Sequence, residues 1–325
     1  AVGKWHCGDQ PEFLPTNHGF DEWFGLPYSN DMGIQSGDAL AKGFFDARRA
    51  EGFEVPDFPY PPLPLMNGDQ VVETQPDQTM LTRRYVERSI EIMREHAERP
   101  FFLYFAHMHV HLPLFVEEVF HDGSRNGPYG AAVAAIDWAT GALLDELDAL
   151  GLADDTVVVF TSDNGALARP GEGSNAPLRG KKGRTSDGGM RVPGIVRWPG
   201  TVPAGTECDE LVTAMDLLPT FAAWAGTAVP DDTVIDGRDV GAVLTDGASS
   251  PHETFAYYGG PCLEAIRDQR YKLRLATRDG LERVVVEELY DLTADIGETT
   301  DIAAEHPDVV ARLQDAATRF RRELG

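Results

Sequence analysis

The fold of this chain is decided by the stretch Thr156-Val157-Val158-Val159-Phe160-Thr161-Ser162-Asp163-Asn164-Gly165. Its first half is apolar and β-branched, as in a buried strand, and residues 130–150 before it have the length of a helix that Gly151 closes. Helix, short turn, strand and polar tip in this order predict an α/β fold. In such folds ligands bind beyond the carboxyl ends of strands, which is where Asp163 and Asn164 stand.

The pair Asp163 and Asn164 admits two interpretations. A carboxylate and a carboxamide offer hard oxygen ligands, which suit Ca²⁺ or Mg²⁺ better than they suit a soft metal. Asp-Asn-Gly is also a strong turn signal, so these residues taken alone could mark a turn and nothing more. The choice between the two interpretations depends on the other motifs of the chain.

Length and charge limit the class of protein. A chain of 325 residues can bury a full α/β core with a smaller second lobe. The formal net charge of −25 argues against nucleic acid as a partner, because phosphate binding needs a basic surface. An anionic substrate would need a few cations gathered at its pocket. The sequence contains no apolar run near the ~20 residues that cross a bilayer, and it does not indicate an oligomeric state.

The cysteines suggest neither a disulfide framework nor a zinc site. Cys7, Cys208 and Cys262 are widely spaced, and each is expected to be a small buried hydrophobe. The chain has no Asn-x-Ser/Thr glycosylation sequon. This absence favours a bacterial-type protein, periplasmic, secreted or cytoplasmic, over a lysosomal one.

Residue periodicity predicts the remaining elements. Residues 38–77 are rich in Pro, Gly and Asp and are expected to wrap the surface as a loop that shapes a pocket rim. Helices are predicted over 79–98, 211–225 and 307–324, the second kinked or broken by Pro219. Strands are predicted over 101–106, 192–198, 254–258, 263–267, 271–275 and 284–289. The last four fit an antiparallel sheet, so residues 1–248 are interpreted as one domain and 249–325 as a C-terminal subdomain.

Further motifs carry a family resemblance. They are Gly3-Lys4-Trp5-His6, Pro27-Tyr28-Ser29-Asn30-Asp31, His109-Val110-His111-Leu112-Pro113, Leu178-Arg179-Gly180-Lys181-Lys182-Gly183-Arg184-Thr185 and Gly188-Gly189-Met190-Arg191-Val192-Pro193-Gly194. With the Asp163 tip and Leu289-Tyr290-Asp291-Leu292, this ordered set resembles the formylglycine-dependent sulfatases of the arylsulfatase and N-acetylgalactosamine-6-sulfatase type. The likeness covers nearly the whole chain. It implies an alkaline-phosphatase-like α/β fold, a mixed sheet flanked by helices, and hydrolysis of a sulfate ester.

Lys4 and His6 open the chain as a possible catalytic pair. They lie two residues apart, so in an extended segment they share one face. Taken by themselves, they fit a solvated lysine beside a structural histidine better than a catalytic pair. The resemblance assigns Lys4 to binding the nucleophile and sulfate, and His6 to general-base work on the hydrated aldehyde.

The histidines His107, His109 and His111 alternate after a predicted strand and are expected on a common face. In the family the functional histidine precedes x-Pro, which selects His111. Its implied role is to bind a sulfate oxygen and to protonate the leaving group, a role that suits a side chain titrating near neutrality. His107 and His109 are expected to support it, with His109 beside the substrate. Zinc would need further soft ligands that these motifs do not supply.

The glycine-rich segment supplies the second lysine. The resemblance makes Lys182 a catalytic residue in a Gly-Lys-Gly position, although Lys181 stands where a glycine is usual. The segment lacks the spacing of a nucleotide P-loop. Ser29 matches a family serine near the substrate, although loop serines commonly form turns. Asp163 and Asn164 carry over as Ca²⁺ ligands, with Mg²⁺ the second choice, and all these residues are expected to share one pocket.

One family feature is missing. The nucleophile of the family is a Cys or Ser in a C/S-x-P-S-R motif, converted to formylglycine, and no such motif occurs in this chain. The strand that would bring a paired Asp to the metal is missing too. Both precede the lysine motif in the family, so the chain is expected to be truncated at its N-terminus and inactive alone. The alternatives are a phosphonate or phosphate monoester hydrolase of the same superfamily and a non-catalytic sulfated-glycan binder.

Overall fold

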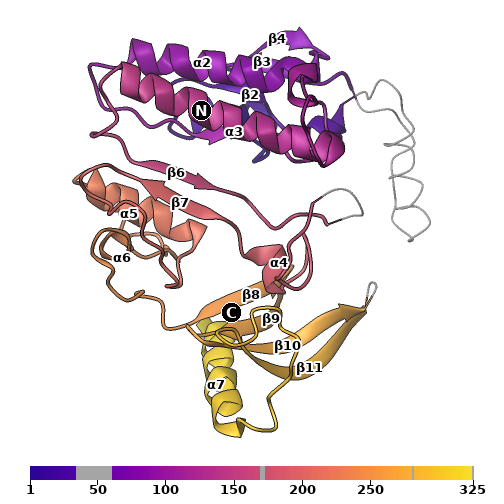
Figure 1. The fold of residues 1–325 in the computed structure, drawn as a ribbon. Coiled ribbons are helices and arrows are strands. Elements are labelled where there is room, and N and C mark those ends of the chain that lie inside the picture. The colour runs from indigo at the N-terminus through magenta and orange to yellow at the C-terminus, as the bar shows by residue number, and fades with distance from the viewer. Residues whose placement is uncertain (34–60, 169–172, 280–281, 324–325) are drawn as a thin grey trace. The chain divides into compact units, whose positions relative to one another are not determined.

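The computed structural model describes residues 1–33, 61–168, 173–279 and 282–323. The chain divides into two compact units, Ala1–Ala153 and Asp154–Gly325, and each is described by itself (Figure 1). No helix in the described ranges is long and apolar enough to cross a membrane.

The first unit contains a mixed five-stranded sheet in the order β4-β3-β2-β1-β5. Its strands are β1 (Val2–Lys4), β2 (Phe24–Leu26), β3 (Pro64–Asn67), β4 (Gln70–Thr74) and β5 (Phe105–Ala106). Strand β1 runs parallel to β2 and to β5, whereas β3 is antiparallel to both of its neighbours. The carboxyl ends of β2, β1 and β5 therefore meet at one edge of the sheet.

Two long helices, α2 (Leu81–Glu95) and α3 (Gly127–Ala149), lie side by side in this unit (Figure 1). Helix α2 buries a stripe of Leu81, Tyr85 and Ile92 in one core with Val2 and Leu26 of the strands. The first half of helix α3 buries small residues, which lets it approach its neighbours closely: Ala131, Ala132, Ala135 and Ala139. The helix predicted over 130–150 is confirmed, and that predicted over 79–98 starts as a 3₁₀ turn, Gln78–Met80.

Two predictions for the first unit are wrong. The described part of the segment 38–77 is not only loop, because β3 and β4 form an antiparallel hairpin there; residues 38–60 lie outside the described residues. The turn signal Asn67-Gly68 marks this hairpin, with Gly68 at φ +59°. The strand predicted over 101–106 is reduced to β5, because only Val2 and Gly3 of β1 pair with it.

The second unit begins with an antiparallel pair, β6 (Val158–Thr161) and β7 (Gly194–Arg197). Three short helices follow the first strand: α4 (Asp187–Met190), α5 (Leu217–Trp224) and α6 (Gly241–Asp246). The apolar residues of β6 are half-buried and not fully buried as predicted. The helix predicted over 211–225 begins only at Leu217, so Pro219 lies in its first turn, where no backbone N–H is needed.

The C-terminal part of the second unit is a four-stranded antiparallel sheet in the order β11-β10-β9-β8. Its elements are β8 (Phe255–Gly259), β9 (Cys262–Arg267), β10 (Tyr271–Asp279), β11 (Glu282–Asp291) and the helix α7 (Pro307–Glu323). Leu313 of α7 is fully buried among Ile266, Leu273 and Leu289 of the sheet. The predicted antiparallel sheet and terminal helix are confirmed.

The three cysteines are unpaired, and two of them are exposed. Cys7 lies in the first unit and Cys208 in the second, while Cys262 on β9 is partly buried. The expectation that each fills a small buried space is wrong for Cys7 and Cys208. Both stand in loop segments rich in polar and glycine neighbours, which contribute no apolar core.

Candidate active site

The parallel part of the first sheet delivers predicted site residues to one edge. Lys4 is the last residue of β1, Ser29 follows β2 by three residues, and the histidine cluster follows β5. The N–H of Trp5 donates to the Leu26 carbonyl at 2.9 Å, and that of His6 donates to the Pro27 carbonyl at 3.0 Å. The ladder therefore continues past the strand ends, where ligands bind in parallel α/β sheets.

Lys4 and His6 do not share the face of an extended segment. His6 has φ +56°, in the left-handed region, so the two-residue alternation assumed for this segment ends there. Lys4 is half-buried and His6 is exposed. The sequence spacing alone was insufficient because it assumed an extended backbone.

The structure brings Ser29 and His111 together from positions 82 residues apart. The Ser29 Oγ lies 3.3 Å from His111 Nδ1, which also lies 2.7 Å from the Leu112 carbonyl oxygen. Because a carbonyl can only accept, the neutral ring of His111 carries its proton on Nδ1 and keeps the Nε2 lone pair. The Asp31 carboxylate stands 4.0 Å from Nδ1. This pair is the most direct contact between two predicted site residues.

The other two histidines form a separate, half-buried pair. The rings of His107 and His109 are 5.5 Å apart, and the His109 N–H donates to His107 Nδ1 at 3.3 Å. Neither His107 Nε2 nor His109 Nδ1 has a hydrogen-bond partner among the described residues. Burial lowers the pKa of His107 to about 3 and that of His109 to about 4, so both rings are neutral at physiological pH.

The predicted common face of the three histidines is wrong. The N–H of His111 donates to the Met108 carbonyl at 3.2 Å, so the segment turns after β5 and does not stay extended. Side chains in a turn do not alternate as they do in a strand. His111 consequently contacts Ser29, while His107 and His109 contact each other.

In the second unit the Asp163 tip and the glycine-rich segment are joined by backbone hydrogen bonds. The Lys182 N–H donates to the Ala166 carbonyl at 3.0 Å, and the Gly165 N–H donates to the Gly189 carbonyl at 3.1 Å. A Cβ on Gly165 would collide with the Gly188 carbonyl oxygen, so only glycine permits this approach. Asp163 and Asn164, at the end of β6, thus adjoin the segment that carries Lys182.

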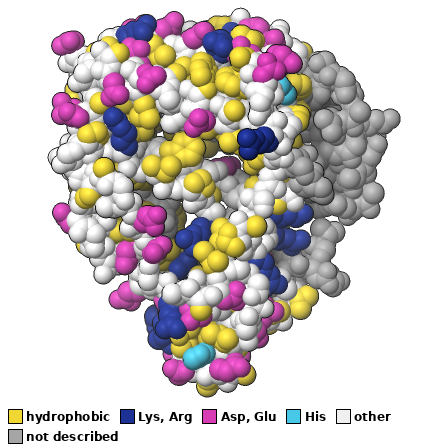
Figure 2. Space-filling model, in the orientation of Figure 1, with side chains coloured by type: hydrophobic (Ala, Val, Ile, Leu, Met, Phe, Trp, Pro, Cys, Tyr) yellow, Lys and Arg dark blue, Asp and Glu magenta, His cyan; other side chains and the backbone are white. Residues whose placement is uncertain are grey.

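Cations are concentrated around this segment although the chain as a whole is strongly acidic. The exposed members are Lys181, Lys182, Arg184 and Arg191. Figure 2 shows Lys and Arg side chains around α4 and over the adjoining end of the C-terminal sheet. A cavity of about 270 Å³ in the same unit is lined by Arg179, Arg184 and Arg274, beside Thr185 and Glu264. The exposed side chains around Lys182 are therefore mainly positive.

Sequence reasoning missed a buried ion cluster next to these residues. Lys272 of β10 is fully buried, and its Nζ lies 2.6 Å from Asp187 Oδ1 and forms an ion pair with Glu298. The alternation of Lys272 and Arg274 with Leu273 and Leu275 gives no signal of this, since charged residues on one side of a strand usually face water.

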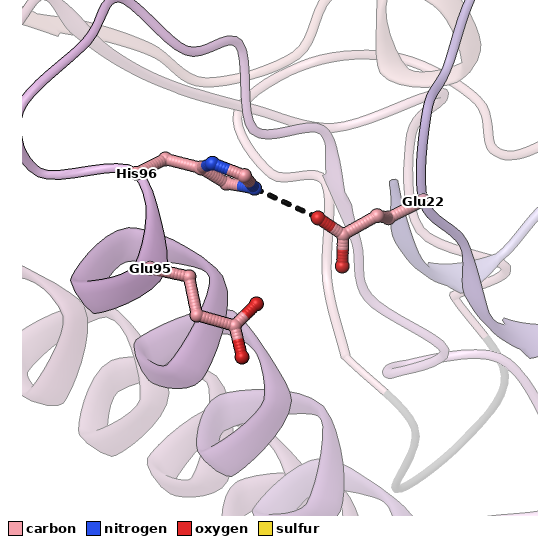
Figure 3. Close-up of side chains that lie close together, drawn as sticks. All are labelled: Glu22, Glu95 and His96. Carbon is pink, nitrogen blue, oxygen red and sulfur yellow. Dashed lines mark hydrogen bonds and ion pairs between the residues drawn. The ribbon is translucent and has the colours of Figure 1, made fainter.

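The acidic cluster of Glu22, Glu95 and His96 is a saturated ion-pair network and not part of the site (Figure 3). Arg99 Nε donates to His96 Nδ1 at 2.9 Å, so His96 Nε2 carries a proton and donates it to Glu22 Oε1 at 2.7 Å. Arg88 pairs with Glu22 and lies 3.8 Å from Glu95. The His96 hydrogen bond is the main cause that lowers the pKa of Glu22.

The predicted site residues are divided between the two units. The first carries Lys4, His6, Ser29, His109 and His111, and the second carries Asp163, Asn164 and Lys182. Each group is assembled within its own unit by the contacts described above. Their meeting in one pocket stays a prediction.

Comparison with known families gives two matches. A model of the family described as "Sulfatase" matches residues 1–227, and one described as "N-sulphoglucosamine sulphohydrolase, C-terminal" matches residues 182–323. Together they span nearly the whole chain. The first alone covers more than half of it.

Curated relatives and a solved structure agree with these matches. Arylsulfatase A of Bos taurus is 37% identical over 288 residues, covering 85% of this chain and 55% of that protein. N-acetylgalactosamine-6-sulfatase of Canis lupus familiaris is 37% identical over 281 residues, covering 85% of this chain and 51% of that protein. The chain thus spans about half the length of these relatives. The crystal structure of Ps i-CgsB with k-i-k-neocarrahexaose is 28% identical at a TM-score of 0.77, covering 98% of this chain and 70% of that one. The predicted alkaline-phosphatase-like α/β fold is confirmed.

Proposed function

Because the chain belongs to the sulfatase family, we propose that it is part of a sulfuric ester hydrolase of the arylsulfatase kind and that each of the two groups described above supplies residues to the reaction. The observation that carries the proposal is the paired delivery of Ser29 and His111, with Lys4 on the adjoining strand, to one sheet edge. The joining of the Asp163 tip to the Lys182 segment supports it from the second unit. We assign residues 1–248 to the catalytic domain and 249–325 to a C-terminal subdomain.

The formylglycine nucleophile is proposed to come from a segment outside these 325 residues. The support is that no C/S-x-P-S-R motif occurs in the chain and that the chain covers about half of each curated relative. The three cysteines stand outside that motif, and none is assigned to the nucleophile. The chain alone is accordingly proposed to be inactive.

The described residues have two roles in the proposed reaction: lysines neutralise charge, and histidines transfer protons. Hydrolysis breaks the bond between sulfur and the ester oxygen, and that oxygen must leave with a proton. His111 suits this step because the Leu112 carbonyl accepts from its Nδ1–H, so that Nε2 can take up a proton from solvent and, in the doubly protonated ring, pass it to the leaving ester oxygen. Lys4 and Lys182 neutralise the sulfate oxygens, whose charge spreads in the transition state. His6 is assigned the general-base role and His109 a place beside the substrate with Ser29.

A divalent cation fits the tip of β6. Asp163 and Asn164 present a carboxylate and a carboxamide side by side, a hard oxygen donor set that suits Ca²⁺ first and Mg²⁺ second. Ca²⁺ prefers about 6–8 oxygen ligands, so these two residues supply part of the shell. When bound, the ion would supply positive charge that stabilises the sulfate group. We propose that Asp163 and Asn164 hold it while Lys182 remains a separate cation.

An assay of sulfate ester hydrolysis tests the proposal. A protein that contains the chain and a formylglycine segment should hydrolyse an aryl sulfate, and the chain by itself should not. Activity of the chain alone would refute the assignment of the nucleophile to another segment. If the longer protein cleaves a phosphonate or phosphate monoester faster than an aryl sulfate, the proposed function becomes that of a phosphonate or phosphate monoester hydrolase. Binding of a sulfated oligosaccharide without turnover by the longer protein would indicate a non-catalytic glycan binder.

A further inference from the structure

The buried ion cluster of the second unit joins three separate segments. Lys272 is the second residue of β10, Asp187 lies in the first turn of α4, and Glu298 lies in the loop after β11. All three are essentially inaccessible to solvent. The Lys272 Nζ also lies 4.1 Å from the centroid of the Tyr257 ring, a favourable cation–π distance.

Tyr257 completes the cluster as a hydrogen-bond donor. Its hydroxyl oxygen lies 3.3 Å from Asp187 Oδ1, the same oxygen that Lys272 contacts. Burial, followed by the Asp187 carboxylate, raises the pKa of Tyr257 far above its ordinary value, so the hydroxyl keeps its proton. The Asp187 carboxylate thus faces three groups of the C-terminal sheet, because Arg267 of β9 also lies 3.9 Å from its Oδ2.

Such a cluster fixes geometry more than it adds stability. Apolar side chains of similar volume would often fill a core as well, because each buried charge loses its hydration. Charged groups tolerate burial only in arrangements that keep their partners within hydrogen-bond distance. The cluster is therefore an effective means of holding α4 at a single place on the C-terminal sheet.

The cluster holds both ends of the segment that carries Lys182. At one end, Arg179 donates through NH1 to the Glu298 carbonyl and to the Tyr290 hydroxyl, each at 3.0 Å. At the other end, Asp187 reaches Glu298 through Lys272. Glu298 thus contacts one end with its backbone and the other, through a lysine, with its carboxylate.

Backbone hydrogen bonds connect Asp187 directly to the candidate site residues. The N–H of the next residue, Gly188, donates to the Arg179 carbonyl at 2.8 Å and closes the segment. Gly189, one residue further, accepts the hydrogen bond from Gly165 that holds the Asp163 tip. A shift of Asp187 would therefore move the Lys182 segment and the metal-binding tip together.

We propose that Asp187, Lys272 and Glu298 are positioning residues that hold the Lys182 segment and the Asp163 tip in the geometry that binds sulfate. This inference rests on the proposed function, in which Lys182 binds the sulfate group. The three residues act through the backbone and do not touch the substrate. They determine how precisely the exposed cations of the Lys182 segment are positioned for sulfate.

Hydrogen exchange and sulfate binding of the intact chain test this proposal. The variants Asp187→Asn and Glu298→Gln each remove one negative charge and leave Lys272 with the other carboxylate, so both should fold. We expect amide exchange in residues 178–191 to rise about tenfold and the Kd for inorganic sulfate, measured by calorimetry, to rise about tenfold as well. Exchange in α7 should remain unchanged.

The matched control is Leu313→Ala, which removes a fully buried side chain beneath the same sheet without touching the segment. Even if this variant lowers the Tm as much as the two charge variants do, it should leave the amide exchange of residues 178–191 and the sulfate Kd unchanged. Equal effects of Leu313→Ala and Asp187→Asn would overturn the positioning role, as would unchanged exchange in the two charge variants. A Lys182→Ala variant that binds sulfate as before would refute the proposed function instead, and the exchange comparison would still decide the positioning role.

Discussion

The two units hold their site residues by different means. In the first, the ladder of parallel strands and uncharged hydrogen bonds set Ser29 against His111, and the adjoining pair His107 and His109 is half-buried and neutral. In the second, glycine contacts and buried charges set the segment of Lys182. The group assigned to proton transfer thus rests on neutral contacts, and the group assigned to the anion is anchored by ion pairs. Acid should disturb the first, and lost glycine or charge the second.

The largest expected effect follows from adding a side chain at Gly165, where the backbones of two segments of the second unit touch. In Gly165→Ala the new Cβ would collide with the Gly188 carbonyl, so the backbone joint between the Asp163 tip and the Lys182 segment must open. We expect the free energy of unfolding to fall by about 3 kcal/mol. Chemical denaturation measures it.

The control for this change is Gly194→Ala in the same unit. A Cβ on Gly194 has no heavy atom within 4 Å, and this glycine does not need a left-handed backbone. Its stability should change by less than about 0.5 kcal/mol. Equal losses in the two variants would show that the glycine joint is not special.

The next effect concerns turnover in a protein that includes the formylglycine segment. Lys182→Ala and His111→Ala should each lower kcat by about 10²-fold or more, because each removes a charge-stabilising group or a proton donor. Lys181→Ala is the matched control, since Lys181 is an exposed cation beside Lys182. A loss at Lys181 as large as that at Lys182 would mean that only the general charge of the segment matters. Steady-state kinetics on an aryl sulfate distinguish the two results.

The half-buried histidines His107 and His109 should make the first unit sensitive to acid. The pKa values of His107 and His109 are lowered on folding, so the unfolded chain binds more protons below about pH 6.5 and stability falls as the pH drops toward 4. Each histidine should lose about 2 kcal/mol of stability between pH 7 and pH 5. Denaturation curves at pH 7, 6 and 5 measure the loss. The double variant His107→Gln and His109→Gln should flatten this dependence, and an unaltered slope would contradict the account.

The smallest effect belongs to the Ser29 hydroxyl. Ser29→Ala removes one contact of His111 Nδ1 but leaves the Leu112 carbonyl to hold the ring. We expect a threefold to tenfold loss of kcat, about the worth of one uncharged hydrogen bond. Ser29→Thr, which keeps the hydroxyl, should retain most of the activity. A loss near that of His111→Ala would show that Ser29 has a direct role in the reaction.

The sequence predicted those parts of the molecule that depend on local pattern. The terminal helix α7 and the strands β8 to β11 follow from periodicity, and the order of motifs gave the family. The hairpin of β3 and β4 escaped notice because it lies in a Pro- and Gly-rich segment whose only clear signal is Asn67-Gly68. The prediction that the three histidines share one face was wrong because a turn directly follows β5.

The ion cluster could not have been predicted, because it depends on tertiary pairing. Lys272 lies 85 residues from Asp187 along the chain, and nothing in the residues around either of them marks burial. A lysine in an alternating strand is normally solvated. The pairing of Ser29 with His111 could be anticipated only as far as both were expected near the substrate.

The exposed cysteines provide built-in measuring points. Cys7 carries a free thiol in the first unit, directly after His6, and Cys208 carries one in the second. With Cys262 replaced by serine, a spin label on each remaining thiol would allow the distance between Cys7 and Cys208 to be measured. Pulsed dipolar spectroscopy could then record the separation of the two labels with and without sulfate.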